Sequence, residues 1–100
     1  MSEPTTFDEA LDAIVEECTV LMKGKRLDYG TAGILNTPFG VEKALVTRCY
    51  DKLSRIVHLL TTEEAPRNES MEDSWRDLAN YALIALLVRR RWFDLPVQGR

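Results

Sequence analysis

The segment LANYALIALLV, residues 78–88, decides the fold, because it is apolar on nearly every side of the helix that it is expected to form. We expect that helix to span residues 70–93, with Pro96 preventing any continuation. A membrane-spanning helix needs roughly 20 apolar residues, and this run is shorter and contains Asn80 and Tyr81. The segment therefore predicts a central, buried helix of a small helical domain.

Two other segments repeat apolar residues at helical spacing. Residues 6–23 do so at Phe7, Leu11, Ile14, Cys18 and Leu21. Residues 41–60 do so at Leu45, Cys49, Leu53, Ile56 and Leu60. Between them, residues 24–40 hold four glycines and Pro38, so we expect a long connection with one short helical turn. The prediction is an all-α bundle of three long helices plus that turn, forming one domain over residues 1–100.

Length and charge narrow the possible functions. The chain has 100 residues and a formal net charge of -3. A negative charge argues against direct binding to nucleic acid. It still allows a nucleotide substrate, because a metal ion can neutralise the phosphates.

The acidic first 15 residues do not resemble a signal peptide, and Cys18 and Cys49 are expected to be free thiols. We expect a cytoplasmic protein, in the host cytoplasm if it is phage-encoded. No membrane contact is expected, and three helices give a thin bundle that a dimer or tetramer would complete.

An acidic row on the third long helix is the first candidate site. Asp73, Asp77 and Asn80 lie on one side of that helix, with Glu69 one turn earlier and Tyr81 beside them. Carboxylates that face an interior are costly unless they are paired or bind a metal, and oxygen ligands suit Mg²⁺. The alternative is that Asp73 and Asp77 only stabilise the start of the helix. Glu17 lies at the edge of the first apolar stripe, from where it could join the site.

Basic and aromatic residues could bind the substrate of such a site. Arg48, Lys52 and Arg55 form a row on the second long helix that could hold phosphate, although pairing with Asp51 explains the row equally well. Within residues 24–40, Gly30 permits a tight turn and Tyr29 could stack on a base.

Three motifs in a fixed order resemble those of a known family. They are K-x-x-D-Y-G at residues 25–30, R-x-x-D-K-L-x-R at residues 48–55, and E-S-x-x-D-x-x-x-D-L-A-N-Y at residues 69–81. This order resembles the nucleotide modification associated domains of phages and bacteria, which look related to the MazG-like all-α nucleotide pyrophosphohydrolases. The resemblance covers roughly residues 16–87. It implies a MazG-like fold and a Mg²⁺-dependent hydrolase, with Mn²⁺ as a possible substitute, that cleaves a nucleoside triphosphate to the monophosphate and pyrophosphate.

The resemblance also implies roles for individual residues. MazG-like enzymes take their metal ligands from an E-E-x-x-E helix and an E-x-x-D helix. Glu16 and Glu17 match the first pair, with Val20 in place of the third glutamate, whereas Asp77 matches the aspartate and Ser74 stands at the glutamate position. The expected metal ligands are Glu17, Glu69, Asp73 and Asp77, and all of these except Glu69 are also the expected catalytic residues. The expected substrate-binding residues are Lys25, Asp28, Tyr29, Lys52, Arg55, Asn80 and Tyr81.

Two other functions stay open at this stage. The chain could be a non-catalytic nucleotide-binding module that serves a pathway of DNA-base modification, which the departures from the two glutamate motifs favour. It could also be a structural protein that only oligomerises through its helices.

Overall fold

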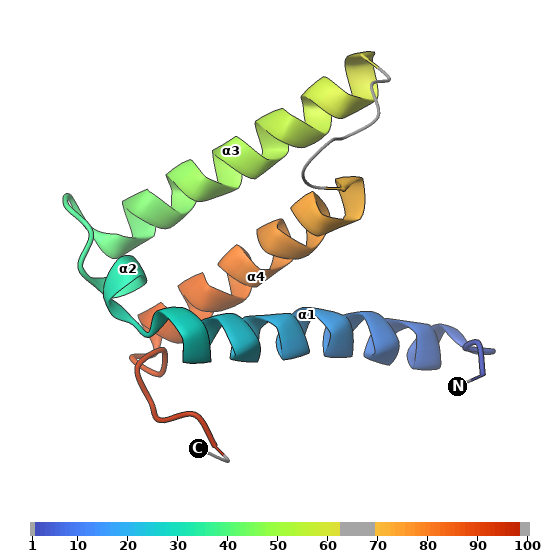
Figure 1. The fold of residues 1–100 in the computed structure, drawn as a ribbon, viewed down its shortest axis with the longest axis horizontal. Coiled ribbons are helices and arrows are strands. Elements are labelled where there is room, and N and C mark those ends of the chain that lie inside the picture. The colour runs from blue at the N-terminus through green and yellow to red at the C-terminus, as the bar shows by residue number, and fades with distance from the viewer. Residues whose placement is uncertain (1, 63–69, 99–100) are drawn as a thin grey trace.

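All the secondary structure in the described residues, 2–62 and 70–98 of this computed structural model, is helical. The elements are α1 (Phe7–Tyr29), α2 (Ala32–Leu35), α3 (Val41–Thr62) and α4 (Met71–Arg89). Three long helices and one short turn confirm the predicted fold class. The helix α4 packs along α3 and also contacts α1, so it is the central element of the bundle (Figure 1).

The starts of α1 and α4 follow from side-chain caps. The Oγ1 atom of Thr6 accepts a hydrogen bond from the backbone N–H of Glu9 at 3.1 Å. At α4, Ser70 and Asp73 form a reciprocal capping box, in which each side chain accepts a hydrogen bond from the backbone N–H of the other. Both caps satisfy amide groups that have no partner inside the helix.

The end of α1 differs from the prediction, because the helix continues past Lys23 to Tyr29. Gly24 weakens a helix by only about 1 kcal/mol, and the last turns gain tertiary contacts that the sequence pattern does not reveal. Among these, Arg26 donates from Nε to the carbonyl of Phe93 at 3.3 Å and from Nη2 to that of Leu95 at 3.1 Å. The K-x-x-D-Y-G motif is therefore the last turn of a helix and its cap. The expected short helical turn is confirmed as α2.

Gly30 ends α1 in a conformation with φ 69° and ψ −150°, which is nearly exclusive to glycine. We expect Gly30→Ala to lower the free energy of unfolding by about 1–3 kcal/mol. Gly24→Ala is the matched control, since an added Cβ there meets nothing within 4 Å inside a helix. It should raise stability by about 0.4–1 kcal/mol. Urea unfolding of both variants measures the two shifts, and equal stabilities would contradict this account of the cap.

The end of α4 also differs, since the helix stops at Arg89 and not at Phe93. Arg91 adopts a left-handed conformation with φ 61°. The N–H of Trp92 then bonds back to the carbonyl of Leu87 at 2.8 Å, and the N–H of Arg91 to that of Val88 at 3.0 Å. This pair of bonds is a Schellman motif, and it reverses the chain well before Pro96. The reversal carries Phe93 into the core.

The core joins α3, α4 and the C-terminal segment. Leu45, Ile84 and Phe93 form its buried cluster. Further buried residues are Cys18 on α1 and Ile56 and Leu59 on α3. Both cysteines are free, as predicted. Within the described residues, no helix is long and apolar enough to cross a membrane.

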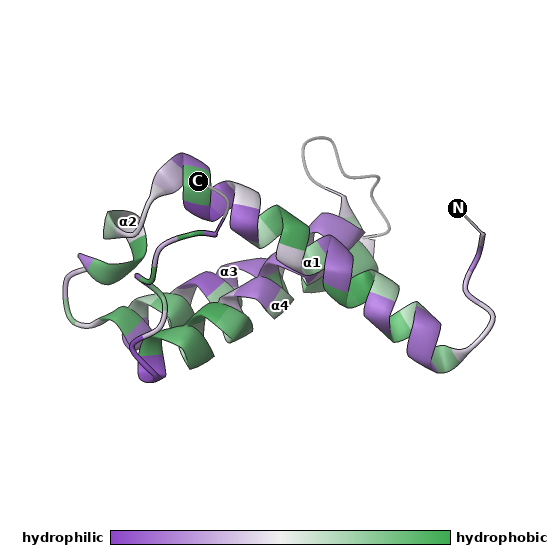
Figure 2. Cartoon of the chain, turned by 90° about the horizontal axis from the view of Figure 1, so that it is seen from below, coloured by the Kyte–Doolittle hydropathy of each residue, from purple (hydrophilic) through white to green (hydrophobic). Residues whose placement is uncertain are grey.

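Two of the predicted apolar stripes are only partly covered. On α1, Phe7, Leu11 and Ile14 are 77%, 49% and 55% exposed, because the N-terminal half of the helix extends beyond its neighbours (Figures 1 and 2). On α3, Leu53 and Leu60 are exposed as well. The predicted stripes are therefore present, but in the single chain these residues lie outside the core.

Candidate functional site

A pocket of about 360 Å³ lies between α1, α2 and α4. Residues of α1 form one wall, at Met22, Lys25, Arg26 and Tyr29. Residues of α4 form the facing wall, at Asp77, Asn80, Tyr81 and Ile84. Gly30, Gly33, Ile34, Arg48 and Phe93 complete the lining. Each wall has the spacing i, i+3, i+4, i+7, which places all four side chains on one helix face.

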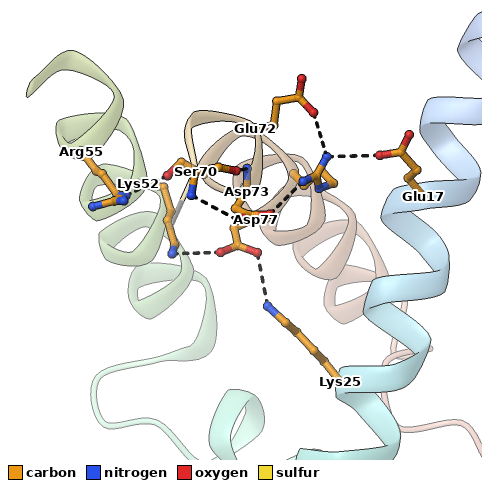
Figure 3. Close-up of polar contacts among 10 residues, drawn as sticks. Glu17, Lys25, Lys52, Arg55, Ser70, Glu72, Asp73 and Asp77 are labelled. Carbon is orange, nitrogen blue, oxygen red and sulfur yellow. Dashed lines mark hydrogen bonds and ion pairs between the residues drawn. The ribbon is translucent and has the colours of Figure 1, made fainter. Parts of the chain in front are cut away.

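Asp77 forms the charged end of this pocket together with two lysines. Its Oδ2 lies 2.9 Å from Nζ of Lys52, and its Oδ1 lies 3.3 Å from Nζ of Lys25 (Figure 3). The three residues come from α4, α3 and α1, so the cluster joins all three long helices. Burial acts to raise the pKa of Asp77, but the hydrogen bonds and charges of Lys52 and Lys25 outweigh it, and the pKa lies below its ordinary value. Asp77 is therefore a carboxylate at neutral pH.

A second cluster surrounds Arg76 on the neighbouring face of α4. Its guanidinium contacts Asp73 at 2.8 Å, Glu17 of α1 at 3.2 Å and Glu72 at 3.3 Å (Figure 3). The hydrogen bonds from Arg76 and from Ser70 lower the pKa of Asp73 to about 2. Asp73 is thus ionised, completes the capping box of α4 and pairs with an arginine. The capping box agrees with the alternative that Asp73 stabilises the start of the helix, and its role as a metal ligand stays a prediction.

Two arginines of α3 fix the walls of the site. Arg48 donates from Nη2 to the carbonyl of Gly33 at 3.0 Å and lies over the ring of Tyr81, 6.0 Å from its centre. This holds α2 against the pocket. Arg55 donates from Nε to Oγ of Ser74 at 3.1 Å, and Ser74 is fully buried. Arg55 therefore links α3 to α4 behind the pocket.

Asn80 is deeply buried in the α4 wall, with 6% of its surface exposed. Its Nδ2 donates to the backbone carbonyl of Cys18 at 3.0 Å and so ties α4 to α1. Its Oδ1 is shielded from solvent and has no hydrogen-bond partner in the described part of the chain. Buried polar atoms without a partner are rare in folded proteins.

The described carboxylates do not converge on one point. Within residues 2–62 and 70–98, no group of three histidine, cysteine, aspartate or glutamate side chains is placed to hold a metal ion. Glu17 and Asp73 approach each other through Arg76, whereas Asp77 faces the two lysines. Glu69, the fourth expected ligand, lies outside the described residues.

Most of the expected substrate-binding residues gather at the pocket. Lys25, Tyr29, Asn80 and Tyr81 line it, and Lys52 reaches it through Asp77. Asp28 and Arg55 are outside the lining. Arg48, from the row that could hold phosphate, also lines the pocket, whereas the sequence patterns did not indicate Arg26 or Phe93. With α1 extended to Tyr29, the spacing of Met22, Lys25 and Arg26 would have indicated Arg26, whereas Phe93 depends on the chain reversal at Arg91.

Comparison with known protein families gives a match over most of the chain. A model of the family described as nucleotide modification associated domain 1 matches residues 25–88, which is more than half of the chain and contains most of the pocket lining. No curated protein and no solved structure matches the chain. The match confirms the family resemblance, while the relation to MazG-like enzymes stays a prediction.

Proposed function

This chain belongs to the nucleotide modification associated domain 1 family, and from that premise we propose that its pocket binds a nucleoside triphosphate and that the domain hydrolyses it to the monophosphate and pyrophosphate. The observation that carries the proposal is the order of residues along the α4 wall. Asp77 lies at a charged end beside Lys25, Asn80 and Tyr81 follow one turn later, and Ile84 lies at an apolar end beside Phe93. A nucleotide likewise has a charged phosphate end and a nucleoside end that is less polar.

The charges of the pocket support an anionic ligand. Lys25, Arg26 and Arg48 line it, against Asp77 as the one acidic residue among the described lining. Basic side chains bind phosphate oxygens through charge-assisted hydrogen bonds. The volume also lies within the range of roughly 300–1,000 Å³ that is usual for ligand pockets.

The proposed substrate is the Mg²⁺ complex of the triphosphate, with Mn²⁺ as a substitute. Magnesium is commonly held by one or two carboxylates together with substrate phosphates, and Asp77 is the carboxylate that the described pocket offers. The ion would neutralise phosphate charge. In the reaction, the oxygen of a water molecule bonds to the α-phosphorus, the bond to the bridging oxygen breaks, and pyrophosphate leaves. Lys25 and Lys52 would hold phosphate oxygens during this exchange.

A specific observation favours a second function, which is nucleotide binding without turnover. Each described carboxylate of the expected metal set already pairs with a basic side chain: Glu17 and Asp73 with Arg76, and Asp77 with Lys25 and Lys52. A module of this kind would present or store a nucleotide for a base-modifying enzyme.

Pyrophosphate release and a thermal shift separate the two functions. The assay uses the four NTPs and four dNTPs, each with Mg²⁺ and with EDTA. Metal-dependent release supports hydrolysis. A nucleotide-induced rise in melting temperature without release supports the binding module. A protein that shows neither response has a purely structural role, and the proposal is then wrong.

Lys25→Met tests the phosphate end of the pocket. We expect about tenfold weaker nucleotide binding, because the substitution removes a charge-assisted hydrogen bond while it keeps the apolar stem. Isothermal titration with the best-bound nucleotide measures the effect. Lys43→Met makes the same change in charge at an exposed position of α3 outside the pocket, and its affinity should match that of the wild type. Equal losses in both variants would show a general charge effect and no site at Lys25.

A further inference from the structure

Asn80 combines deep burial with a place in the pocket wall. One of its two Nδ2 hydrogens is donated to the carbonyl oxygen of Cys18, an atom that can only accept. This contact fixes the orientation of the amide, because a flipped side chain would set two oxygens against each other. The Oδ1 atom must therefore point away from Cys18, and in the described part of the chain it meets no donor.

An acceptor that is removed from water and left without a donor is destabilising, so folded proteins rarely keep one without a reason. Bulk water does not replace the missing bond here, since Oδ1 is shielded from solvent. A donor that enters from the pocket would satisfy it, and the wall around Asn80 would have to yield slightly for contact. An N–H or O–H group of a ligand has the chemistry that this atom lacks.

The position of Asn80 indicates which part of a nucleotide supplies that donor. One turn before it, Asp77 and Lys25 form the charged end of the pocket, and one turn after it, Ile84 packs with Phe93. Phosphates at the charged end direct the nucleoside toward Asn80 and the apolar end, where a planar base is better suited than a polar sugar. Tyr81, beside Asn80 in the lining, adds an aromatic surface.

We propose that Oδ1 of Asn80 accepts a hydrogen bond from an N–H group of the bound base, so that the pocket selects nucleotides whose base presents such a donor. This inference rests on the proposed nucleotide binding and adds a specificity-determining residue to it. Since Nδ2 already bonds to Cys18, Oδ1 is the polar atom of Asn80 that is left without a partner among the described residues, and as an acceptor it distinguishes a base with a donor from one without.

The test compares pairs of ligands on the wild-type protein, so it does not depend on a variant that folds. Isothermal titration first identifies the best ligand among dAMP, dCMP, dGMP and dTMP. That nucleotide is then compared with the derivative in which methyl groups replace every base N–H hydrogen, for example N3-methyl-dTMP or N4,N4-dimethyl-dCMP. We expect the methylated form to bind about tenfold more weakly or worse. The 2′,3′-dideoxy form, which lacks the sugar hydroxyl, should bind like the parent.

Asn80→Ala separates a lost hydrogen bond from a steric effect of the methyl groups. The variant removes the acceptor and enlarges the pocket, so the ratio of the two affinities should fall toward one. Equal binding of parent and methylated base to the wild type overturns the inference while the proposed function stands. A loss confined to the dideoxy form assigns the donor to the sugar and also overturns it. If none of the four monophosphates and none of the triphosphates binds, the proposed function fails together with the inference.

Discussion

Asp77→Asn should reduce metal-dependent pyrophosphate release by about a hundredfold or more, the usual cost of removing a catalytic acid–base or charge-stabilising group. Asp77 is the one carboxylate in the described pocket lining, so no neighbouring acid of that lining can take its place. In EDTA the same substitution should tighten nucleotide binding by about fivefold. The reason is that Lys25 and Lys52 lose their carboxylate partner and attract phosphate more strongly.

Asp77→Asn is informative because turnover should fall while nucleotide affinity in EDTA should rise. Asp51→Asn is the matched control, because it removes the same charge from an exposed position of α3 outside the pocket. Neither turnover nor affinity should change in that control. Unchanged turnover in Asp77→Asn would remove Asp77 from the reaction. Tighter binding in the variant, with no turnover even in the wild type, would identify the binding module. Circular dichroism checks that both variants keep their helices.

Features that depend only on the spacing of residues along one helix could be predicted from the sequence. The apolar run at residues 78–88 correctly predicted the central helix, although Leu83 and Leu86 are exposed in the single chain. The predicted starts at residues 6 and 70 lie one residue before those of α1 and α4. Of the predicted row, Asp77 and Asn80 lie on the α4 wall of the pocket, whereas Asp73 does not line it. The helical period of about 3.6 residues decides which residues share a face, so their spacing in the sequence is enough to predict these features.

Features that depend on contacts between distant segments were not predictable in this way. Gly24 and Gly30 both lay in the predicted connection of residues 24–40, yet Gly24 continues α1, and Gly30 has the positive φ that ends it. The last turns of α1 are supported by bonds from Arg26 to carbonyls beyond α4, which no local pattern indicates. In the same way, Lys25 and Lys52 are far apart in sequence, and only the packing of three helices brings both to Asp77.

The acidic row shows where residue type alone misleads. Asp73 and Asp77 are equivalent on a helical wheel, but they face different partners. Asp73 completes the capping box with Ser70 and meets an arginine of its own helix, whereas Asp77 points between helices toward lysines from two others. The direction of a side chain relative to neighbouring helices decides between these roles, and a single helix does not specify it.

Ile56→Ala should lower the free energy of unfolding by about 2–5 kcal/mol, through lost burial and the cavity left behind. Ile56 is only 2% exposed and lies on α3, the helix that packs most extensively on α4. A domain of this size has about 5–15 kcal/mol of total stability, so the variant should be partly unfolded at moderate temperature. Urea unfolding followed by circular dichroism measures the change.

Ile14→Ala is the matched control for Ile56→Ala, since it makes the same substitution at a residue of α1 that is 55% exposed. In a monomer its cost should stay below about 1 kcal/mol, because far less apolar surface leaves water on folding. Repeating the urea unfolding at several protein concentrations also tests the expected dimer or tetramer. If a second copy covers the exposed stripe of α1, Ile14→Ala should lower the free energy of unfolding by more, and by an amount that depends on protein concentration. Equal costs at both positions in a dilute monomer would contradict the core described for this chain, because burial would then not distinguish Ile56 from Ile14.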